Sequence, residues 1–228
     1  MIKAEHITKS FGSVQVLKGV SLEVAPAEVV CITGASGAGK TTFLQVLGTL
    51  TRPDSGQVWI GDTPVCELKK DNLADFRNKH IGFVFQSYNL IPVLTALENV
   101  SFIMLLQKQP KAKMEERARE MLKQVGLADK MNVRPGRLSG GQQQRVAVAR
   151  ALASKPDFVL ADEPTANLDT ESAFNLLDIM ARLNKEEGIT LIFSTHDQRV
   201  IDRARRVITL VDGAVAEDKQ KEASVEVS

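Results

Sequence analysis

A glycine-rich segment that ends in a lysine and two threonines is the first part of this sequence with an evident chemistry. It reads Gly34-Ala35-Ser36-Gly37-Ala38-Gly39-Lys40-Thr41-Thr42, and up to Thr41 it fits the pattern GxxxxGK[ST]. The glycines let the loop turn its backbone N–H groups inward, toward phosphate oxygens. Lys40 is then expected at the β- and γ-phosphates, and the Thr41 hydroxyl at a Mg²⁺ ion. The segment alone predicts a site for a nucleoside triphosphate and Mg²⁺.

Two carboxylates follow an apolar run much later in the chain. The run is Phe158-Val159-Leu160-Ala161, and Asp162 and Glu163 come directly after it. An apolar strand that ends in acidic residues places them at the carboxyl edge of a sheet, where ligands of α/β proteins gather. Asp162 is predicted to hold Mg²⁺ through its water shell, and Glu163 to act as general base on the attacking water. We therefore expect hydrolysis as well as binding.

A third phosphate-related signal lies between these two. It is Leu138-Ser139-Gly140-Gly141-Gln142, which reads as an N-cap serine, two small residues and the start of a helix. A helix N-terminus with exposed glycine amides is an anion site. A second anion site for the same nucleotide in the same chain is redundant, which favours a role toward the nucleotide of another subunit. The residues alone leave this point open.

Single polar or aromatic residues complete the set of candidates. Gln86 and His196 each follow an apolar strand, where either side chain can sense the γ-phosphate by hydrogen bonding. Phe11 is a candidate for stacking on adenine, or else a packing residue. His6 and His80 have no comparable setting, and we expect them to be structural.

The elements that must position these residues alternate between strand and helix. Residues 28–33 form an apolar strand that runs into the glycine loop, and residues 41–50 have helical apolar spacing. The pattern predicts a mostly parallel α/β core made of residues 1–86 and 156–217. A helical insert over 87–155 interrupts it, and 218–228 read as a polar, frayed tail. The whole is one domain.

Composition excludes several classes of protein. The chain has 228 residues, of which 43% are hydrophobic, enough for one α/β domain with a substantial core. Lys plus Arg number 29 and Asp plus Glu 28, so a nucleic-acid partner held by a strongly basic surface is not expected. No apolar run has the length of a membrane helix, and Met1–His6 do not resemble a signal peptide. We expect no direct membrane insertion, so any membrane role needs a partner.

The segment after Gln86 is too apolar for an ordinary exposed loop. It reads Ser87-Tyr88-Asn89-Leu90-Ile91-Pro92-Val93-Leu94. Such a segment predicts either a surface for a partner or burial into the helical insert. Its position directly after Gln86 lets a γ-phosphate sensor move whatever docks there.

Taken together, these motifs resemble those of the ATP-binding subunits of ABC transporters. Residues 34–41 resemble the Walker A motif, 138–142 the LSGGQ signature and 159–163 Walker B. Likewise Gln86 resembles the Q-loop residue, 167–169 the D-loop, His196 the switch histidine and Phe11 the A-loop aromatic. The resemblance implies a P-loop NTPase (RecA-like) core with an N-terminal antiparallel β subdomain and an α-helical signature subdomain. It also implies that Gln86 takes part in the Mg²⁺ site.

The same resemblance implies partners and a location. An ATP-bound homodimer is expected, with each nucleotide between one Walker A and the opposite signature. Integral-membrane permease subunits would hold the protein at the cytoplasmic face of the inner membrane. Residues 81–92, 94–100 and 138–147 resemble the branch of lipoprotein-release and macrolide-export ATPases, which includes the cell-division subunit FtsE. Ala35 and Ala166 stand where the family usually has Pro and Gly.

The expected function is therefore an ATPase that drives a permease, with lipoproteins or amphiphilic compounds as cargo. The alternative within the family is an ATPase of a cell-division or stress-signalling membrane complex that transports nothing. A DNA-maintenance ATPase is disfavoured because the insert is too short for a long coiled coil. A small-molecule kinase is disfavoured because it needs neither the signature helix nor His196.

Overall fold

The first of two sheets is antiparallel and comes mostly from the amino-terminal part of the chain. The computed structural model describes residues 1–202 and 204–221. In this sheet the strands lie in the order β2-β1-β4-β5. Their bounds are Ile2–Phe11 (β1), Val14–Val24 (β2), Ser55–Ile60 (β4) and Thr63–Pro64 (β5). Along β2 Leu17, Val20, Leu22 and Val24 are buried, so one face of the sheet meets the core and the other meets solvent.

The second sheet is mostly parallel and has the strand order β10-β9-β3-β8-β7-β6. Only β10 runs antiparallel to its neighbour. The strands are Val29–Thr33 (β3), Ile81–Val84 (β6), Phe158–Asp162 (β7), Thr190–Ser194 (β8), Arg206–Val211 (β9) and Ala214–Gln220 (β10). The parallel strands are nearly continuous apolar runs because both faces of the sheet are covered. Their carboxyl ends meet at one edge, which brings the predicted site residues together.

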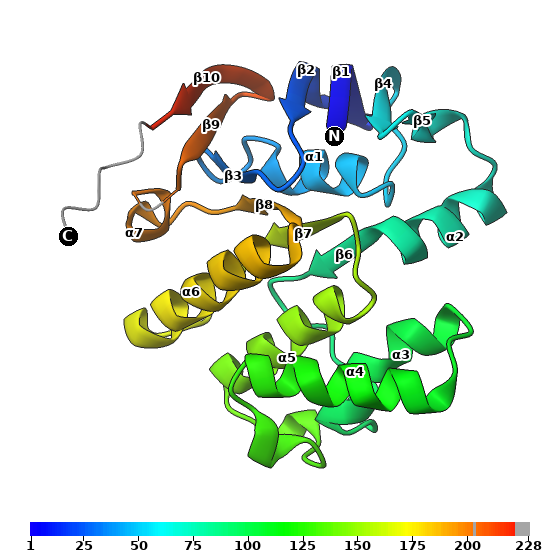
Figure 1. Ribbon diagram of the computed structural model, residues 1–228. Coiled ribbons are helices and arrows are strands. Elements are labelled where there is room, and N and C mark those ends of the chain that lie inside the picture. Colours follow the sequence, from blue (N-terminus) through cyan, green and yellow to red (C-terminus); the bar gives the residue numbers. More distant parts are fainter. Residues whose placement is uncertain (203, 222–228) are drawn as a thin grey trace.

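Helix α1 (Lys40–Leu47) lies between the two sheets, as Figure 1 shows. Its apolar face, which includes Phe43, Leu44 and Leu47, belongs to a core cluster that also contains residues of both sheets. The first helical residue is Lys40, so this packing fixes the phosphate loop directly against the sheet.

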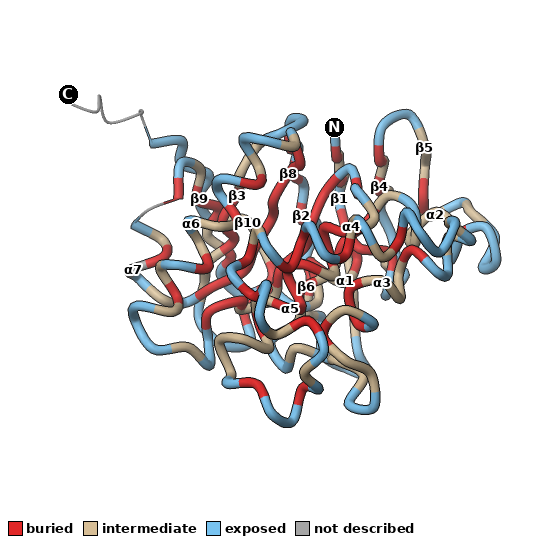
Figure 2. The backbone as a smooth tube through the Cα atoms, turned by 60° about the horizontal axis from the view of Figure 1, so that its bottom comes forward, coloured by how far each residue is buried: buried red, intermediate tan, exposed pale blue. Residues whose placement is uncertain are grey.

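The remaining helices lie mostly on the opposite side of the parallel sheet, although Leu73 and Val65 belong to the core cluster around α1. They are α2 (Lys70–His80), α3 (Ala96–Leu106), α4 (Lys111–Gln124), α5 (Gly140–Ala153), α6 (Thr170–Glu187) and α7 (Gln198–Ile201), with short 3-10 turns η1 (Val65–Glu67), η2 (Ala128–Lys130) and η3 (Pro135–Arg137). Helices α3, α4 and α5 pack on one another, and α5 also contacts β6. Their apolar faces join β7, β8 and α6 in a second core cluster. Figure 2 shows the buried residues concentrated along the central strands.

The predicted fold class is confirmed, and three details of the prediction are corrected. Helix α2 was not predicted, because it is strongly polar and buries only Leu73. Strand β2 starts at Val14, whereas the sequence predicted a strand only over 20–24. Residues 218–220 are not a frayed tail but the end of β10, where Asp218 pairs with Ile208 and its carboxylate accepts two hydrogen bonds from Arg206. The rest of the predicted tail, 222–228, lies outside the described residues.

Candidate nucleotide-binding site

A cavity of about 620 Å³ opens at the carboxyl edge of the parallel sheet. Predicted residues from four separate parts of the chain line it, together with one that was not predicted: Ser36, Gly37, Gly39, Lys40, Thr41, Thr42, Gln86, Glu163, His196 and Val16. Strand order explains the convergence. The loop after β3, Gln86 after β6, Glu163 after β7 and His196 after β8 all emerge at this edge.

The glycine loop has the backbone that the sequence pattern predicts. Gly34, Gly37 and Gly39 have φ angles of 147°, 81° and 99°, which other residues rarely adopt. A Cβ atom on Gly34 would lie 2.3 Å from the Leu210 carbonyl oxygen, so a side chain has no room there. Gly39 caps α1 without a side-chain hydrogen bond, which leaves the first amides of the helix as free donors. Polyphosphate fits this set of donors.

Lys40 is buried, with 8% of its surface exposed. Its Nζ atom donates to the carbonyl oxygens of Gly34 at 2.8 Å and Ala35 at 3.0 Å. In the described ranges, 1–202 and 204–221, no carboxylate forms an ion pair with it. A buried ammonium whose acceptors are neutral is well suited to an anionic ligand in the cavity. Ala35, Gly34 and Ala38 belong to the loop but do not line the cavity.

The hydroxyl of Thr41 and the carboxylate of Asp162 lie where a Mg²⁺ ion is expected. Thr41 Oγ1 donates to Asp162 Oδ1 at 3.1 Å, and Ser194 Oγ donates to the same oxygen at 2.6 Å. Hard oxygen ligands of this kind suit Mg²⁺, which commonly takes one or two carboxylates and completes its shell with phosphate and water. No group of three or more His, Cys, Asp or Glu residues within the described part of the chain could hold a metal alone.

Glu163 is held in a strained backbone conformation beside His196. Its φ angle is 47°, and its N–H donates to Ser194 O at 3.1 Å. Its side chain is 12% exposed, and Oε1 lies 2.7 Å from His196 Nδ1. A carboxylate only accepts, so Nδ1 carries the proton in this bond. Left-handed backbone at a residue with a side chain is costly and typical of functional sites.

Two other predicted residues differ in how they meet the cavity. Gln86 is exposed, and its carbonyl oxygen accepts a bond of 3.2 Å from Asn167 Nδ2. Phe11 is 51% exposed and does not line the cavity, and Lys9 Nζ lies 5.7 Å from the centroid of its ring. Val16 does line it and was not singled out from the sequence. Val16 lies on β2, which packs against Gly39. Only the fold shows that this apolar side chain reaches the cavity.

The residues Ser139, Gly140, Gly141 and Gln142 do not line the cavity of their own chain. They form a capping box at the start of α5, in which Gln142 N donates to Ser139 Oγ at 3.3 Å and Ser139 N to Gln142 Oε1 at 3.0 Å. The structure therefore places these four residues outside the cavity that Lys40 lines. A nucleotide served by both needs a second copy of the chain.

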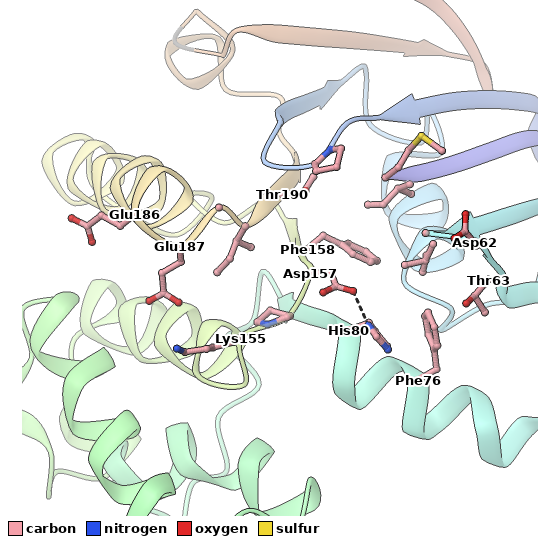
Figure 3. A pocket seen from close by; sticks show the side chains of 18 of the residues that line it. Asp62, Thr63, Phe76, His80, Lys155, Asp157, Phe158, Glu186, Glu187 and Thr190 are labelled. Carbon is pink, nitrogen blue, oxygen red and sulfur yellow. Dashed lines mark hydrogen bonds and ion pairs between the residues drawn. The ribbon is translucent and has the colours of Figure 1, made fainter.

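A second cavity, of about 970 Å³, lies at the opposite ends of the same strands (Figure 3). Phe158 and Thr190, the first residues of β7 and β8, line it, together with His80 and Asp157. Some of its polar groups pair with each other, as in the bond of 2.7 Å between His80 Nδ1 and Asp157 Oδ2 and the ion pair of Arg117 with Glu187. Size alone is no guide to the site, since this cavity lies away from the glycine loop.

Comparison with known proteins identifies the class. Residues 17–166 match the ABC transporter family, and the chain belongs to it. The lipoprotein-releasing system ATP-binding protein LolD of Bacteroides thetaiotaomicron is 48% identical over 96% of this chain and 100% of its own length. An uncharacterized ABC transporter ATP-binding protein of Thermotoga maritima is 48% identical over 89% of this chain and 86% of its own.

A solved structure agrees with these relatives. The dimeric ATP-binding cassette MJ0796, in a post-hydrolysis state bound to ADP and Pi, matches with a TM-score of 0.90 and 40% identity. The match covers 97% of this chain and 99% of that one. The protein is thus the ATP-binding and ATP-hydrolysing subunit of an ABC transporter. Of the helices in residues 1–202 and 204–221, none has the length and apolar character needed to cross a membrane.

Proposed function

We propose that this subunit powers lipoprotein release as an ATP-bound homodimer attached to an integral-membrane permease at the cytoplasmic face of the inner membrane. The observation that carries the proposal is the full-length likeness to the LolD protein of Bacteroides thetaiotaomicron, 48% identical over 100% of that protein. The alternative cargo is an amphiphilic compound exported from the cell, because such a compound shares the apolar chemistry of a lipid anchor.

Each side chain of the site has one task in the proposed reaction. The amides after Gly34 and the ammonium of Lys40 bind the phosphates, while Thr41 and Asp162, with Gln86, hold Mg²⁺. Bound Mg²⁺ supplies charge neutralisation on the phosphate oxygens. Glu163 accepts a proton from the water that attacks the γ-phosphorus, and the bond to the β-phosphate oxygen breaks to leave ADP and phosphate. His196 orients Glu163 and the γ-phosphate.

The homodimer is supported by the place of the signature residues outside the cavity of the glycine loop. Ser139 and the glycines after it present helix N-terminal donors away from the cavity that Lys40 lines. In a two-fold symmetric pair, the signature of each subunit closes the cavity of the other. The dimeric state of the cassette MJ0796 agrees with this arrangement.

The permease contact is supported by an apolar groove of about 610 Å³ between α2, β6 and α3. Its apolar lining includes Leu50, Phe83, Phe85, Ile91, Phe102 and Leu106. Leu50 is 44% and Leu106 54% exposed, which is unusual for large apolar side chains. Within the predicted segment 87–94, Leu90 packs on the core, as the alternative of burial into the insert expects. Asn89 and Ile91 are the residues of that segment that line the groove.

A pair of neighbouring leucines gives a matched test of this contact. Leu106 lines the groove and Leu105 does not, although they are 54% and 55% exposed. We expect Leu106→Asp to abolish co-purification with a membrane protein from solubilised membranes, and Leu105→Asp to retain it. Both variants should hydrolyse ATP as isolated subunits, since the cavity is untouched. Equal co-purification by both variants would place the contact elsewhere.

The cargo is tested by depletion in the source organism. Loss of the subunit should leave lipoproteins in the inner membrane, as measured by fractionation of radiolabelled lipid-anchored proteins. Unchanged lipoprotein sorting, with sensitivity to amphiphilic drugs, would assign the efflux role instead. Normal sorting and normal drug resistance, with a division or stress defect, would favour the complex that transports nothing.

A further inference from the structure

The loop after Gln86 contains two successive residues in left-handed backbone conformation. Tyr88 has a φ angle of 61° and Asn89 one of 49°. Asparagine tolerates this region, but for a bulky side chain such as tyrosine it is an outlier, because Cβ crowds the carbonyl oxygen. Such a conformation persists only where the surroundings hold it.

The guanidinium of Arg150 supplies that hold. Its Nη1 atom donates to Asn89 O at 2.6 Å, and its Nη2 atom donates to Tyr88 O at 2.9 Å. The planar fork of arginine matches two adjacent carbonyl groups, which a lysine ammonium cannot do in the same way. Burial lowers the pKa of Arg150. Within residues 1–202 and 204–221, no carboxylate forms an ion pair with it, so the two carbonyls are what compensate the half-buried charge.

Arg150 belongs to the helix whose first turn carries the signature. Helix α5 runs from Gly140 to Ala153 and has Ser139 as its N-cap. The loop also meets the other end of this helix, because a Cβ atom on Gly140 would lie 3.0 Å from the Tyr88 hydroxyl. The loop thus contacts α5 both at the signature and near its carboxyl end.

We propose that Arg150 is a positioning residue, which fixes the left-handed turn at Tyr88 and Asn89 and so joins the Gln86 loop to the signature helix. The inference rests on the proposed role of Gln86 at the γ-phosphate and Mg²⁺. It adds a fixed link between the sensor of one nucleotide and the signature offered to the second subunit. A displacement of Gln86 is then passed to α5 through the Arg150 guanidinium.

The test is the ATPase rate of Arg150→Ala and its rescue by glycine. We expect kcat to fall on the order of tenfold to a hundredfold, since misplaced catalytic groups cost this much. KM for ATP should change little, because the glycine loop is untouched. The double variant Arg150→Ala with Asn89→Gly should have a kcat several-fold higher than Arg150→Ala alone, because glycine adopts the left-handed conformation without steric cost. Arg150→Lys should recover only part of the rate.

Arg145 provides the matched control on the same helix. Its Nη1 atom donates to Val125 O at 3.4 Å, away from the loop. Arg145→Ala should lower Tm but keep kcat, and Asn89→Gly alone should behave as wild type. Should Arg150→Ala not fold, Arg150→Gln is measured with the same glycine rescue. Failure of the rescue, or an equal loss of kcat in the Arg145 variant, overturns the proposal.

Gln86→Ala separates the proposed role of Gln86 from the positioning role of Arg150. If this variant keeps the wild-type kcat, the proposed role of Gln86 is wrong, whatever Arg150 does. If Gln86→Ala loses activity while Arg150→Ala keeps it, only the positioning role of Arg150 fails.

Discussion

Glu163 Oε1 and His196 Nδ1 lie 2.7 Å apart, although 33 residues separate them in the chain. They meet because β7 and β8 are adjacent parallel strands and each residue lies just beyond the end of its strand. Glu163 is 12% exposed while His196 is 70% exposed. The carboxylate of the proposed base, Glu163, is thus shielded from solvent. The His196 side chain that bonds to it is exposed, so a γ-phosphate or a second subunit can contact and move it.

The first prediction concerns Glu163→Gln. Glutamine keeps the shape and can still accept a bond from His196, but it cannot take the proton of the attacking water. We expect the hydrolysis rate to fall by about 10²–10⁴-fold, the usual contribution of a general base. ATP should remain bound, and an ATP-dependent dimer should appear on size exclusion. Glu171→Gln, an exposed carboxylate on α6, is the control and should hydrolyse normally. A near-normal rate in Glu163→Gln would show that another group is the base.

The second prediction concerns Lys40→Ala. It removes the ammonium that now contacts Gly34 O and Ala35 O, and with it the main cation of the phosphate site. The wild type should gain about 2.7 kcal/mol of stability at a free ATP concentration a hundred times Kd, by mass action. Thermal unfolding with and without ATP measures this gain. Lys40→Ala should fold yet show little of it, and an undiminished gain would place the phosphates elsewhere.

The third prediction concerns a mixture of Lys40→Ala and Ser139→Arg subunits. If each signature serves the opposite nucleotide, a mixed dimer has one site with both lesions and one intact site. Trapping of ATP at one site per mixed dimer is expected, measured with radiolabelled ATP in the Glu163→Gln background. Each variant alone should trap none. Absence of trapping in mixed dimers of demonstrated stoichiometry would argue that Ser139 serves its own chain.

The fourth prediction concerns acid stability through Glu98 in the capping box of α3. The backbone N–H and the hydroxyl of Thr95 both donate to its carboxylate and hold its pKa below the ordinary value of 4.5. A folded-state pKa below the unfolded-state pKa stabilises the fold at pH values above the unfolded-state pKa. This stabilisation is lost as the pH falls through the folded-state pKa. Glu98→Gln keeps the capping box without the titration. The variant should therefore be less stable than the wild type at neutral pH, and this difference in the free energy of unfolding should shrink as the pH falls from about 5 to 3, measured by urea unfolding. A constant deficit would exclude this linkage.

Much of the site could be predicted because its signals are local in the chain. The glycine loop needs particular φ angles at Gly34, Gly37 and Gly39, and only glycine adopts them readily. Asp162 and Glu163 follow an apolar run, and that adjacency alone predicts the carboxyl end of a strand. The alternation of strands and helices was likewise enough to predict a mostly parallel core.

The tertiary structure alone determined two kinds of feature. One is the contacts between residues far apart in the chain, and the other is the elements that lack an apolar pattern. Helix α2 buries little, so its periodicity is weak, and its place comes from packing beside β6. The contribution of Val16 to the cavity depends on how β2 lies against Gly39. Arg150 and the Tyr88 carbonyl are 62 residues apart, and nothing along the chain relates them. Hydrogen bonds of this kind are set by the packing of α5 against β6, which sequence spacing does not encode.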